Sequence, residues 1–238
     1  MAERPILFKG EMVRAILEGK KTETRRIVKP GNTEGPYNRK NLDILWNEGK
    51  VGDPGSIWLP MKHPSDSWDD FDEGAAEAQF FSRIKSGDLL WVKETWAKNP
   101  SCYDGDPEFV YKASFPTGSV DNTHDTLEPH GTWKPSIHIP RRASRITLKV
   151  VSVHAERLQD ITDEGAIAEG IDPEEVHVWN MFNDPDEPVW TNRSAYADLW
   201  ERINGEGSWA LNPWVWVIRF ERIDQQNHQG KINNGGTE

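Results

Sequence analysis

The run Trp214–Phe220 constrains the fold more than any other segment of this 238-residue chain. It reads Trp-Val-Trp-Val-Ile-Arg-Phe, so both faces of an extended segment here are almost entirely apolar. A strand with two apolar faces has to be covered on both, which predicts a central strand of a sheet. The segment 145–154 alternates apolar and polar residues instead and predicts a half-buried strand.

Three further strands and three helices complete the predicted order of elements. Short β-type segments occupy residues 4–8, 24–29 and 89–95, and apolar residues recur at helical spacing in 12–17 and 194–204. Residues 162–170 predict a short helix by their capping residues and by the acids in its first turn. Gly19 and Gly170 stand where the first two helices would end, and Thr162 is an expected N-cap. This order predicts an α+β fold: a small mixed β-barrel with short flanking helices.

The remaining residues predict insertions rather than a second domain. Gly, Pro, Asp, Asn and Trp occur there without a sustained period. We expect a single domain over residues 1–223 that carries long irregular insertions at about 31–85, 97–142 and 172–193. The polar tail, residues 224–238, is typical of a disordered segment.

Composition excludes several classes of protein. The chain has 28 basic and 39 acidic residues, a net charge of −11, which disfavours extended binding along a phosphate backbone. A single cysteine, Cys102, cannot form an internal disulfide, and this fits a reducing compartment. We find no signal peptide and no apolar run of about 18 residues, so we expect a cytoplasmic protein without a membrane partner.

The usual signatures of cofactor and metal sites are also absent. The sequence contains no Gly-x-Gly-x-x-Gly, no Walker loop, no His-Glu-x-x-His, no Gly-x-Ser-x-Gly and no Cys-x-x-Cys. Its histidines are scattered, and the acidic residues near Asp70 lack the glycine-punctuated spacing of a calcium loop. We therefore expect neither a cofactor nor a metal.

The densest group of reactive side chains follows the first predicted helix. Residues 19–26 read Gly-Lys-Lys-Thr-Glu-Thr-Arg-Arg and place four cations together in an acidic protein. A purely structural interpretation is a basic helix C-terminus that complements the helix dipole. For Lys21 to approach Thr24, the chain has to bend after Gly19 or the lysine has to use its long arm.

Gly19-x-Lys21-x-x-Thr24-x-Arg26 resembles the motif Gly-x-Lys-x-x-Glu/Thr-x-Arg of the ASCH domain, a PUA-like β-barrel family. Further segments that resemble this family follow in its order: 87–92, 161–170 and the last predicted helix with 212–218. The longer form, with Trp-x-Pro-Ser-Ile-His-Ile-Pro at 133–140, is similar to ASCH-like proteins carried by phages and prophages. The resemblance covers about 100 residues, one ordinary domain.

Within this family the chain resembles the small bacterial N4-acetylcytidine amidohydrolases. The resemblance implies a catalytic lysine as proton acceptor, a threonine nucleophile and a glutamate proton donor. By motif and by position these are Lys21, Thr24 and Glu169. The implied activity is hydrolysis, without metal, of an acyl amide on N4-acylated cytidine or a related small-molecule modified nucleoside. This chain is more than twice the usual length of those hydrolases, so its insertions could reshape the pocket.

The implied roles place a demand on the lysine. A lysine has an ordinary pKa of about 10.4, so it acts as a base near neutral pH only where burial or neighbouring cations lower that pKa. Lys20, Arg25 and Arg26 are such neighbours. A threonine hydroxyl beside a neutral amine would then be an activated nucleophile.

Other residues are candidates for substrate contacts, each with a structural alternative. Arg26 would contact substrate or orient Glu169, and tryptophans could stack on a base or simply pack in the core. Ser136 and His138 could face the pocket or form a structural turn beside Pro135. The predicted substrate-binding residues are Arg25, Arg26, Trp91, Glu94, Ser136 and His138.

Two other functions stay open. The chain could be a binding module, a PUA-like reader that holds RNA, single-stranded nucleic acid or a modified base, with Lys21, Arg25 and Arg26 on phosphate. A third alternative is a ribonuclease, for which no histidine pair suggests itself.

Overall fold

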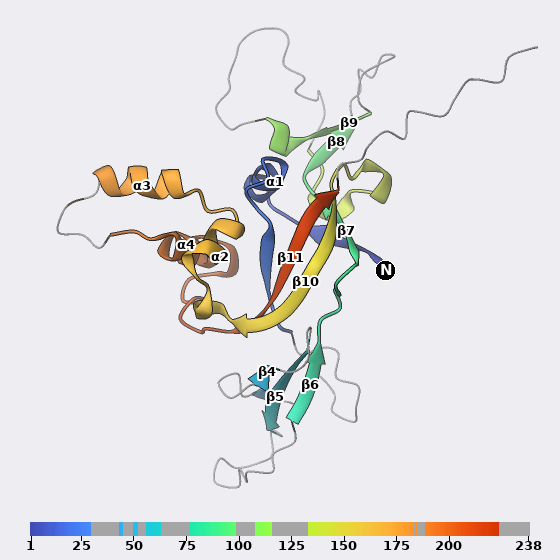
Figure 1. The fold of residues 1–238 in the computed structure, drawn as a ribbon. Helices are drawn as coiled ribbons and strands as arrows, with labels where there is room; N and C mark the ends of the chain where they lie inside the picture. The colour runs from blue at the N-terminus through green and yellow to red at the C-terminus, as the bar shows by residue number, and fades with distance from the viewer. Residues whose placement is uncertain are drawn as a thin grey trace, which may run out of the picture. The chain divides into compact units, whose positions relative to one another are not determined.

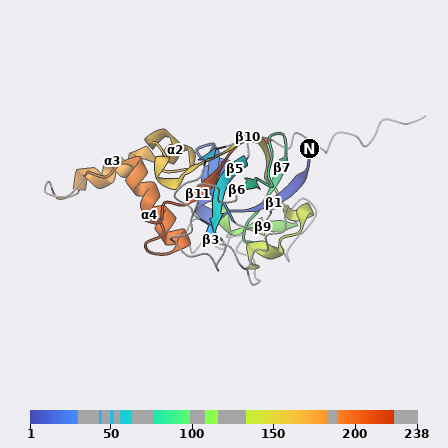
Figure 2. The same cartoon turned by 90° about the horizontal axis from the view of Figure 1, so that it is seen from below.

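We describe a computed structural model of the chain, which places residues 1–29, 43–44, 50–51, 56–62, 77–98, 108–115, 133–182, 184 and 189–223. The chain forms two compact units. Figures 1 and 2 show its helices and strands in two views. Unit 1 contains Met1–Arg14, Asp88–Lys149 and Glu221–Glu238; unit 2 contains Ala15–Gly87 and Val150–Phe220. Helix α1 (Gly10–Leu17) and strands β10 (Thr147–Arg157) and β11 (Trp214–Ile223) have residues in both units.

Unit 1 is built on two pairings of its strand β7 (Leu89–Lys93). Strand β1 (Glu3–Leu7) lies parallel to β7, and the first three residues of β10 lie antiparallel to it. The inward residues Leu90 and Val92 are almost fully buried, as the alternating pattern of this segment requires. A second antiparallel pair consists of β8 (Trp96–Lys98) and β9 (Phe109–Tyr111). Three 3₁₀ helices complete the unit: Lys112–Ser114, Ser136–His138 and Arg141–Ala143.

Unit 2 contains the other end of the mixed sheet. The strand order of the sheet is β1-β7-β10-β11-β2, so β11 lies between β10 and the terminal strand β2 (Glu23–Ile27). Residues Trp214–Ile218 of β11 are all buried, which confirms that this strand is central. Four short strands form a second group: β3 (Asp43–Ile44), β4 (Lys50–Val51), β5 (Ser56–Lys62) and β6 (Glu77–Phe81).

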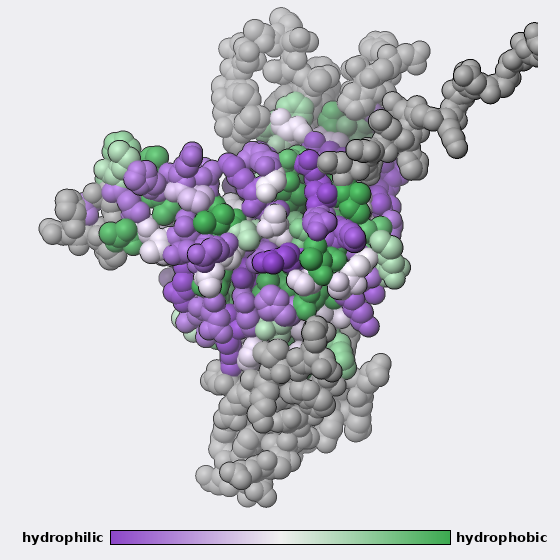
Figure 3. Space-filling view, viewed as in Figure 1, coloured by the Kyte–Doolittle hydropathy of each residue, from purple (hydrophilic) through white to green (hydrophobic). Residues whose placement is uncertain are grey.

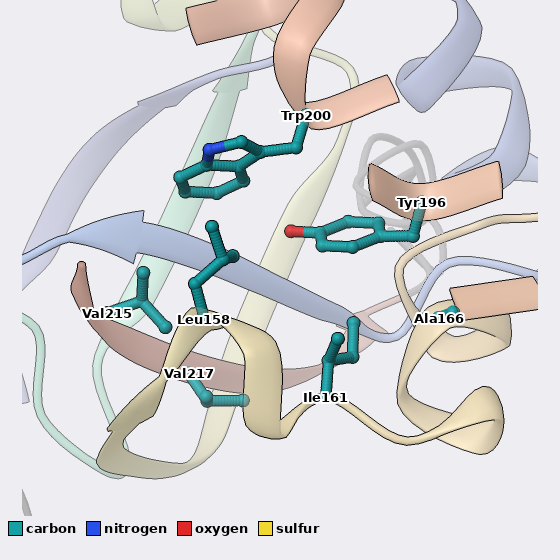
Figure 4. Close-up of a cluster of buried hydrophobic side chains, with 7 residues drawn as sticks. All are labelled: Leu158, Ile161, Ala166, Tyr196, Trp200, Val215 and Val217. Atoms are coloured by element: carbon teal, nitrogen blue, oxygen red, sulfur yellow. The ribbon is translucent and has the colours of Figure 1, made fainter. Parts of the chain in front are cut away.

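Three helices belong to unit 2: α2 (Asp163–Ala168), α3 (Pro173–Phe182) and α4 (Asn192–Asn204). Helices α2 and α4 contribute to a hydrophobic cluster on one face of β11 (Figure 4). The members of this cluster are Leu158, Ile161, Ala166, Tyr196, Trp200, Val215 and Val217. The two valines alternate along β11, so the cluster covers one face of that strand.

Local sequence signals explain where these helices begin. Thr162 caps α2 as predicted, because its hydroxyl accepts a hydrogen bond from the amide of Gly165. Helix α4 begins at Asn192, two residues before the predicted start, because Thr191 and Ser194 form a reciprocal capping box. None of the helices in the placed ranges has the length and apolar character needed to cross a membrane.

The α+β class and the five predicted strands are confirmed as β1, β2, β7, β10 and β11. The expectation of irregular insertions is wrong for parts of them, because β3 to β6, β8, β9 and α3 lie there. Strands of two to seven residues are too short to show a period. The start of α3 was readable, since Pro173 occupies its first position and Asp172 accepts the amide of Glu174. Residues 224–238, the acidic cluster 69–73 and much of the predicted insertions lie outside the placed ranges.

Replacing Leu158 by alanine should destabilise unit 2. Its side chain is fully buried within the hydrophobic cluster, so Leu158→Ala loses apolar contacts and leaves a cavity, a cost of about 2–5 kcal/mol. The free energy of unfolding in urea measures this loss. Leu211→Ala is the matched control, because Leu211 is 74% exposed, and its unfolding free energy should stay within about 0.5 kcal/mol of wild type. Equal losses in both variants would contradict the assignment of this core.

Candidate active site

The turn after α1 places Lys21. Gly19 has a φ of +75°, a conformation that favours glycine, and its amide bonds to the carbonyl of Ile16. The amides of Lys20 and Lys21 both donate to the carbonyl of Ala15, at 2.9 and 3.0 Å. The helix therefore ends at the predicted glycine and the chain bends there, as the approach of Lys21 to the start of β2 requires.

The C-terminus of α2 places Glu169. This residue is the C-cap of the helix, and its amide donates to the carbonyl of Gly165. The amide of Thr22 donates to the carbonyl of Ala168 at 2.8 Å, which ties the end of α2 to the beginning of β2. The carboxylate of Glu169 is thereby held beside the strand that carries the motif.

Lys21 and Glu169 form a buried ion pair. The ammonium Nζ of Lys21 donates to the carboxylate oxygen Oε2 of Glu169 and, at 2.6 Å, to the backbone carbonyl of the same residue. The side chain of Lys21 is 0% exposed and that of Glu169 is 4% exposed. Two predicted catalytic residues, 148 positions apart in the sequence, are therefore in direct contact.

The second carboxylate oxygen of Glu169 binds the backbone of β2. Oε1 accepts the amide of Arg25 at 2.5 Å and the hydroxyl of Tyr196 at 3.2 Å. Thr22 and Val28, which flank β2, hydrogen-bond to β11, so alternation along the strand turns the amide of Arg25 away from β11. β2 is the last strand in the order, so no strand of this order pairs with its other edge. At that edge the carboxylate of Glu169 accepts the backbone N–H of Arg25.

Arg25 extends this network of charges. Its guanidinium is 3% exposed, and its Nε donates to Glu156 Oε1 at 2.8 Å. Its Nη1 lies 3.6 Å from Glu23 Oε2 and 3.5 Å from Glu169 Oε1. Burial opposes the charge on Arg25, but the carboxylates of Glu169 and Glu156 raise its pKa overall. Arg25 therefore stays a cation whose contacts are protein carboxylates.

Thr24 is linked to the ion pair through the backbone of β2. It is 3% exposed and directly precedes the Arg25 amide that binds Glu169. Across the ladder Arg25 opposes Val217, a member of the hydrophobic cluster, whereas Thr24 opposes Ile218. Because side chains alternate along a strand, Thr24 faces the side opposite to Arg25. The nucleophilic role of its hydroxyl stays a prediction.

The surroundings change the proton affinity of two groups. Burial lowers the pKa of Lys21 below its ordinary value of 10.5, and the charges of Arg26 and Arg25 lower it further, against the opposing effect of Glu169. Burial, followed by the charge of Glu169, raises the pKa of Tyr196 well above its ordinary value of 10.0. The site therefore favours a neutral amine on Lys21 more than water does and keeps the Tyr196 hydroxyl protonated.

Of the six predicted substrate-binding residues, only Arg25 and Arg26 belong to unit 2 with the ion pair. Arg26 is exposed and pairs with Trp216 across the ladder. Its charge acts on both Lys21 and Glu169. Its role toward a substrate stays a prediction, as does that of Arg25.

The other four candidates belong to unit 1. Trp91 on β7 is half-buried, with Lys93 Nζ 5.4 Å from its ring centre. Glu94 is 1% exposed and accepts two hydrogen bonds of 2.9 Å from Arg145, a contact typical of a structural ion pair. Ser136 and His138 begin and end a 3₁₀ helix directly after Pro135, so the segment forms a turn, the structural alternative for these two residues.

Tyr196, Glu156 and Glu23 join the site without having been predicted. Tyr196 fits the apolar spacing of α4 and was expected only in the core; a tyrosine in place of phenylalanine there was the one available signal. The two glutamates are distant from each other in sequence, and no motif connects them with Glu169. Among the placed residues no group of three or more His, Cys, Asp or Glu side chains is arranged to hold a metal ion.

Comparison with known proteins gave no match: no family model, no curated protein and no solved structure matches this chain.

Gly170 is predicted to be essential for the geometry of the pair. Its φ is +101°, and a Cβ there would lie 3.1 Å from Ala15 Cβ and 3.3 Å from Lys21 Cβ. Gly170→Ala should therefore cost more than the roughly 1–2 kcal/mol of the backbone conformation alone. Gly207→Ala, at a φ of +76° with open space around it, isolates that backbone cost. Urea unfolding of both variants measures the difference, and equal losses would contradict the close packing against Lys21.

Breaking the ion pair is predicted to destabilise the protein. Lys21→Met leaves the buried Glu169 carboxylate without its main partner, at a cost of about 3 kcal/mol in unfolding free energy. Lys20→Met is the matched control, because the neighbouring Lys20 is half exposed and should contribute little. Urea unfolding at neutral pH compares the two. A smaller loss for Lys21→Met than for Lys20→Met would show that the pair contributes nothing.

Proposed function

We propose that the protein is a metal-independent amidohydrolase that removes an acyl group from N4-acylated cytidine or a related modified nucleoside. The observation that supports this proposal is the buried pair of Lys21 and Glu169, whose carboxylate also accepts the amide of Arg25, the residue after Thr24. We also propose that the mixed sheet belongs to the PUA-like barrel type, as the resemblance to the ASCH family implies.

The pair contains the two proton-transfer groups that the reaction requires. When the proton moves from Lys21 Nζ to the carboxylate of Glu169, the lysine becomes a neutral amine and the glutamate a carboxylic acid. The first is a base and the second a proton donor, and both are then uncharged in a buried site. The pKa of Lys21, lowered by burial, supports this neutral form.

Acyl transfer would then proceed in two balanced steps. Thr24 Oγ1 forms a bond to the acyl carbon and gives its proton to Lys21, while the carbon–nitrogen bond breaks and Glu169 protonates the leaving amine. Water next attacks the acyl carbon and gives a proton to the Glu169 carboxylate. The bond between the acyl carbon and Thr24 Oγ1 breaks, Lys21 returns its proton to Oγ1, and the carboxylic acid is released. The products are the free nucleoside and the acid, and the enzyme returns to its starting protonation state.

The contacts of Lys21 and Arg25 favour the hydrolase over the phosphate-binding reader. Lys21 is engaged by Glu169, and Arg25 is buried against Glu156. A reader that uses these cations on phosphate would have to break both contacts and expose the carboxylates to an anion. Arg26 is exposed, and we propose that it contacts the substrate.

Incubation with N4-acetylcytidine followed by chromatography tests the proposal. Wild type should release cytidine and acetate, and Thr24→Val and Glu169→Gln should each lower kcat by at least about a hundredfold. Lys20→Met is the control variant and should keep wild-type turnover. No turnover by wild type, or undiminished turnover in Thr24→Val, would refute the hydrolase. Salt-dependent binding of an oligonucleotide without turnover would support the reader, and shortened RNA would support the ribonuclease.

The pH dependence of kcat/KM provides a separate prediction. Because the reaction needs the one proton that Lys21 and Glu169 share, kcat/KM should fall at high pH as the pair loses this proton, with a midpoint below the ordinary lysine value of 10.5. Arg26→Gln removes a charge that lowers the pKa of Lys21, so this midpoint should move to higher pH. Arg202→Gln serves as the control, because Arg202 is exposed and pairs with Asp198 within α4. A midpoint that stays the same in Arg26→Gln would contradict the assignment of Lys21 as the base.

A further inference from the structure

A group of exposed apolar side chains lies on and beside α3, away from the residues of the proposed reaction. We name it the α3 patch; its members are Val178, Trp179, Met181, Phe182, Val189 and Trp190. Their exposed fractions range from 41% for Trp190 to 84% for Phe182. Figure 3 shows hydrophobic residues gathered over α3 on the viewed face. Contiguous apolar surface of this kind marks interaction sites in soluble proteins.

The α3 patch is held in a defined shape. The side chain of Asn180 donates to the carbonyl of Trp190 and accepts its amide, both at 2.8 Å. This clamp holds the segment at 189–190 against the helix, and the rings of Trp179 and Trp190 stack with centres 6.3 Å apart and planes 18° apart. Val176 is the buried residue of α3. The helix therefore has an inner anchor and a preorganised outer aromatic surface.

Acidic side chains flank the α3 patch. Glu174 and Glu175 are exposed in the first turn of α3, four residues before Val178 and Trp179, so each acid neighbours a patch residue along the helix surface. The patch is therefore apolar with two acidic side chains beside it.

We propose that the α3 patch is a docking site for a positively charged, amphipathic protein segment. Its apolar side chains would cover Trp179 and Phe182, and its lysines or arginines would face Glu174 and Glu175. The same acidic charge opposes an RNA phosphate backbone or an anionic lipid surface. It also opposes the symmetric pairing of two α3 patches, because a two-fold contact would bring the same acids together.

Binding of a labelled helical peptide of leucine and lysine, about five turns long with leucines at i, i+3, i+4 and i+7, tests the site. The full chain should bind this peptide with an affinity that falls as salt increases, and it should not bind the matching peptide of leucine and glutamate. Trp179→Ser/Phe182→Ser should weaken binding at least about tenfold, and Glu174→Gln/Glu175→Gln should weaken it and flatten the salt dependence. Hydrogen exchange of the wild type should show protection of α3 by the peptide.

Matched controls distinguish binding at the α3 patch from nonspecific hydrophobic or electrostatic binding. Leu211→Ser removes an equally exposed apolar residue elsewhere, and Glu206→Gln removes an exposed acid, so both should bind the peptide like wild type. Circular dichroism checks that every variant is folded. No binding by wild type, equal loss in Leu211→Ser, or protection outside α3 would overturn the proposal. The proposal would also be overturned if the wild type formed a dimer in sedimentation, or bound an oligonucleotide or an anionic vesicle, and Trp179→Ser/Phe182→Ser abolished that association.

Discussion

The buried contact between Lys21 and Glu169 is the interaction on which the rest of this site depends. It joins the turn after α1 to the C-terminus of α2, and through the second carboxylate oxygen it reaches the backbone of β2 and the hydroxyl of Tyr196. A charge removed from water is stable only where it is paired and hydrogen-bonded. Glu169 meets that condition with donors from three separate elements, so these elements are positioned by one carboxylate.

The same contact serves the fold and the proposed chemistry. An ion pair in a buried place adds little net stability, because desolvation offsets the attraction, but the loss of one partner is costly. The proposed reaction benefits from this arrangement, because burial lowers the pKa of Lys21 and so favours its neutral amine. In the proposed reaction the same pair would supply the base and the proton donor.

Much of the site was readable from short-range signals. Gly19, Thr162 and Gly170 mark helix ends by backbone conformation and side-chain capping, and the structure places all three as predicted. Tyr196 was hidden, because its position in α4 follows the apolar spacing of any core residue. Helix α3 lacks a strong apolar stripe facing inward, and its exposed tryptophan and phenylalanine gave the pattern of an insertion instead.

The sequence by itself determined the α+β class, the central strand at Trp214–Phe220 and the local turn that presents Lys21, because these follow from periodicity and from the conformational freedom of glycine. Only the tertiary structure decided that Lys21 and Glu169 are in direct contact, which side of β2 Arg25 occupies and which aromatic residues stay on the surface. Such contacts join residues more than a hundred positions apart, and their free energy depends on burial and on the orientation of neighbouring groups, which no local pattern records.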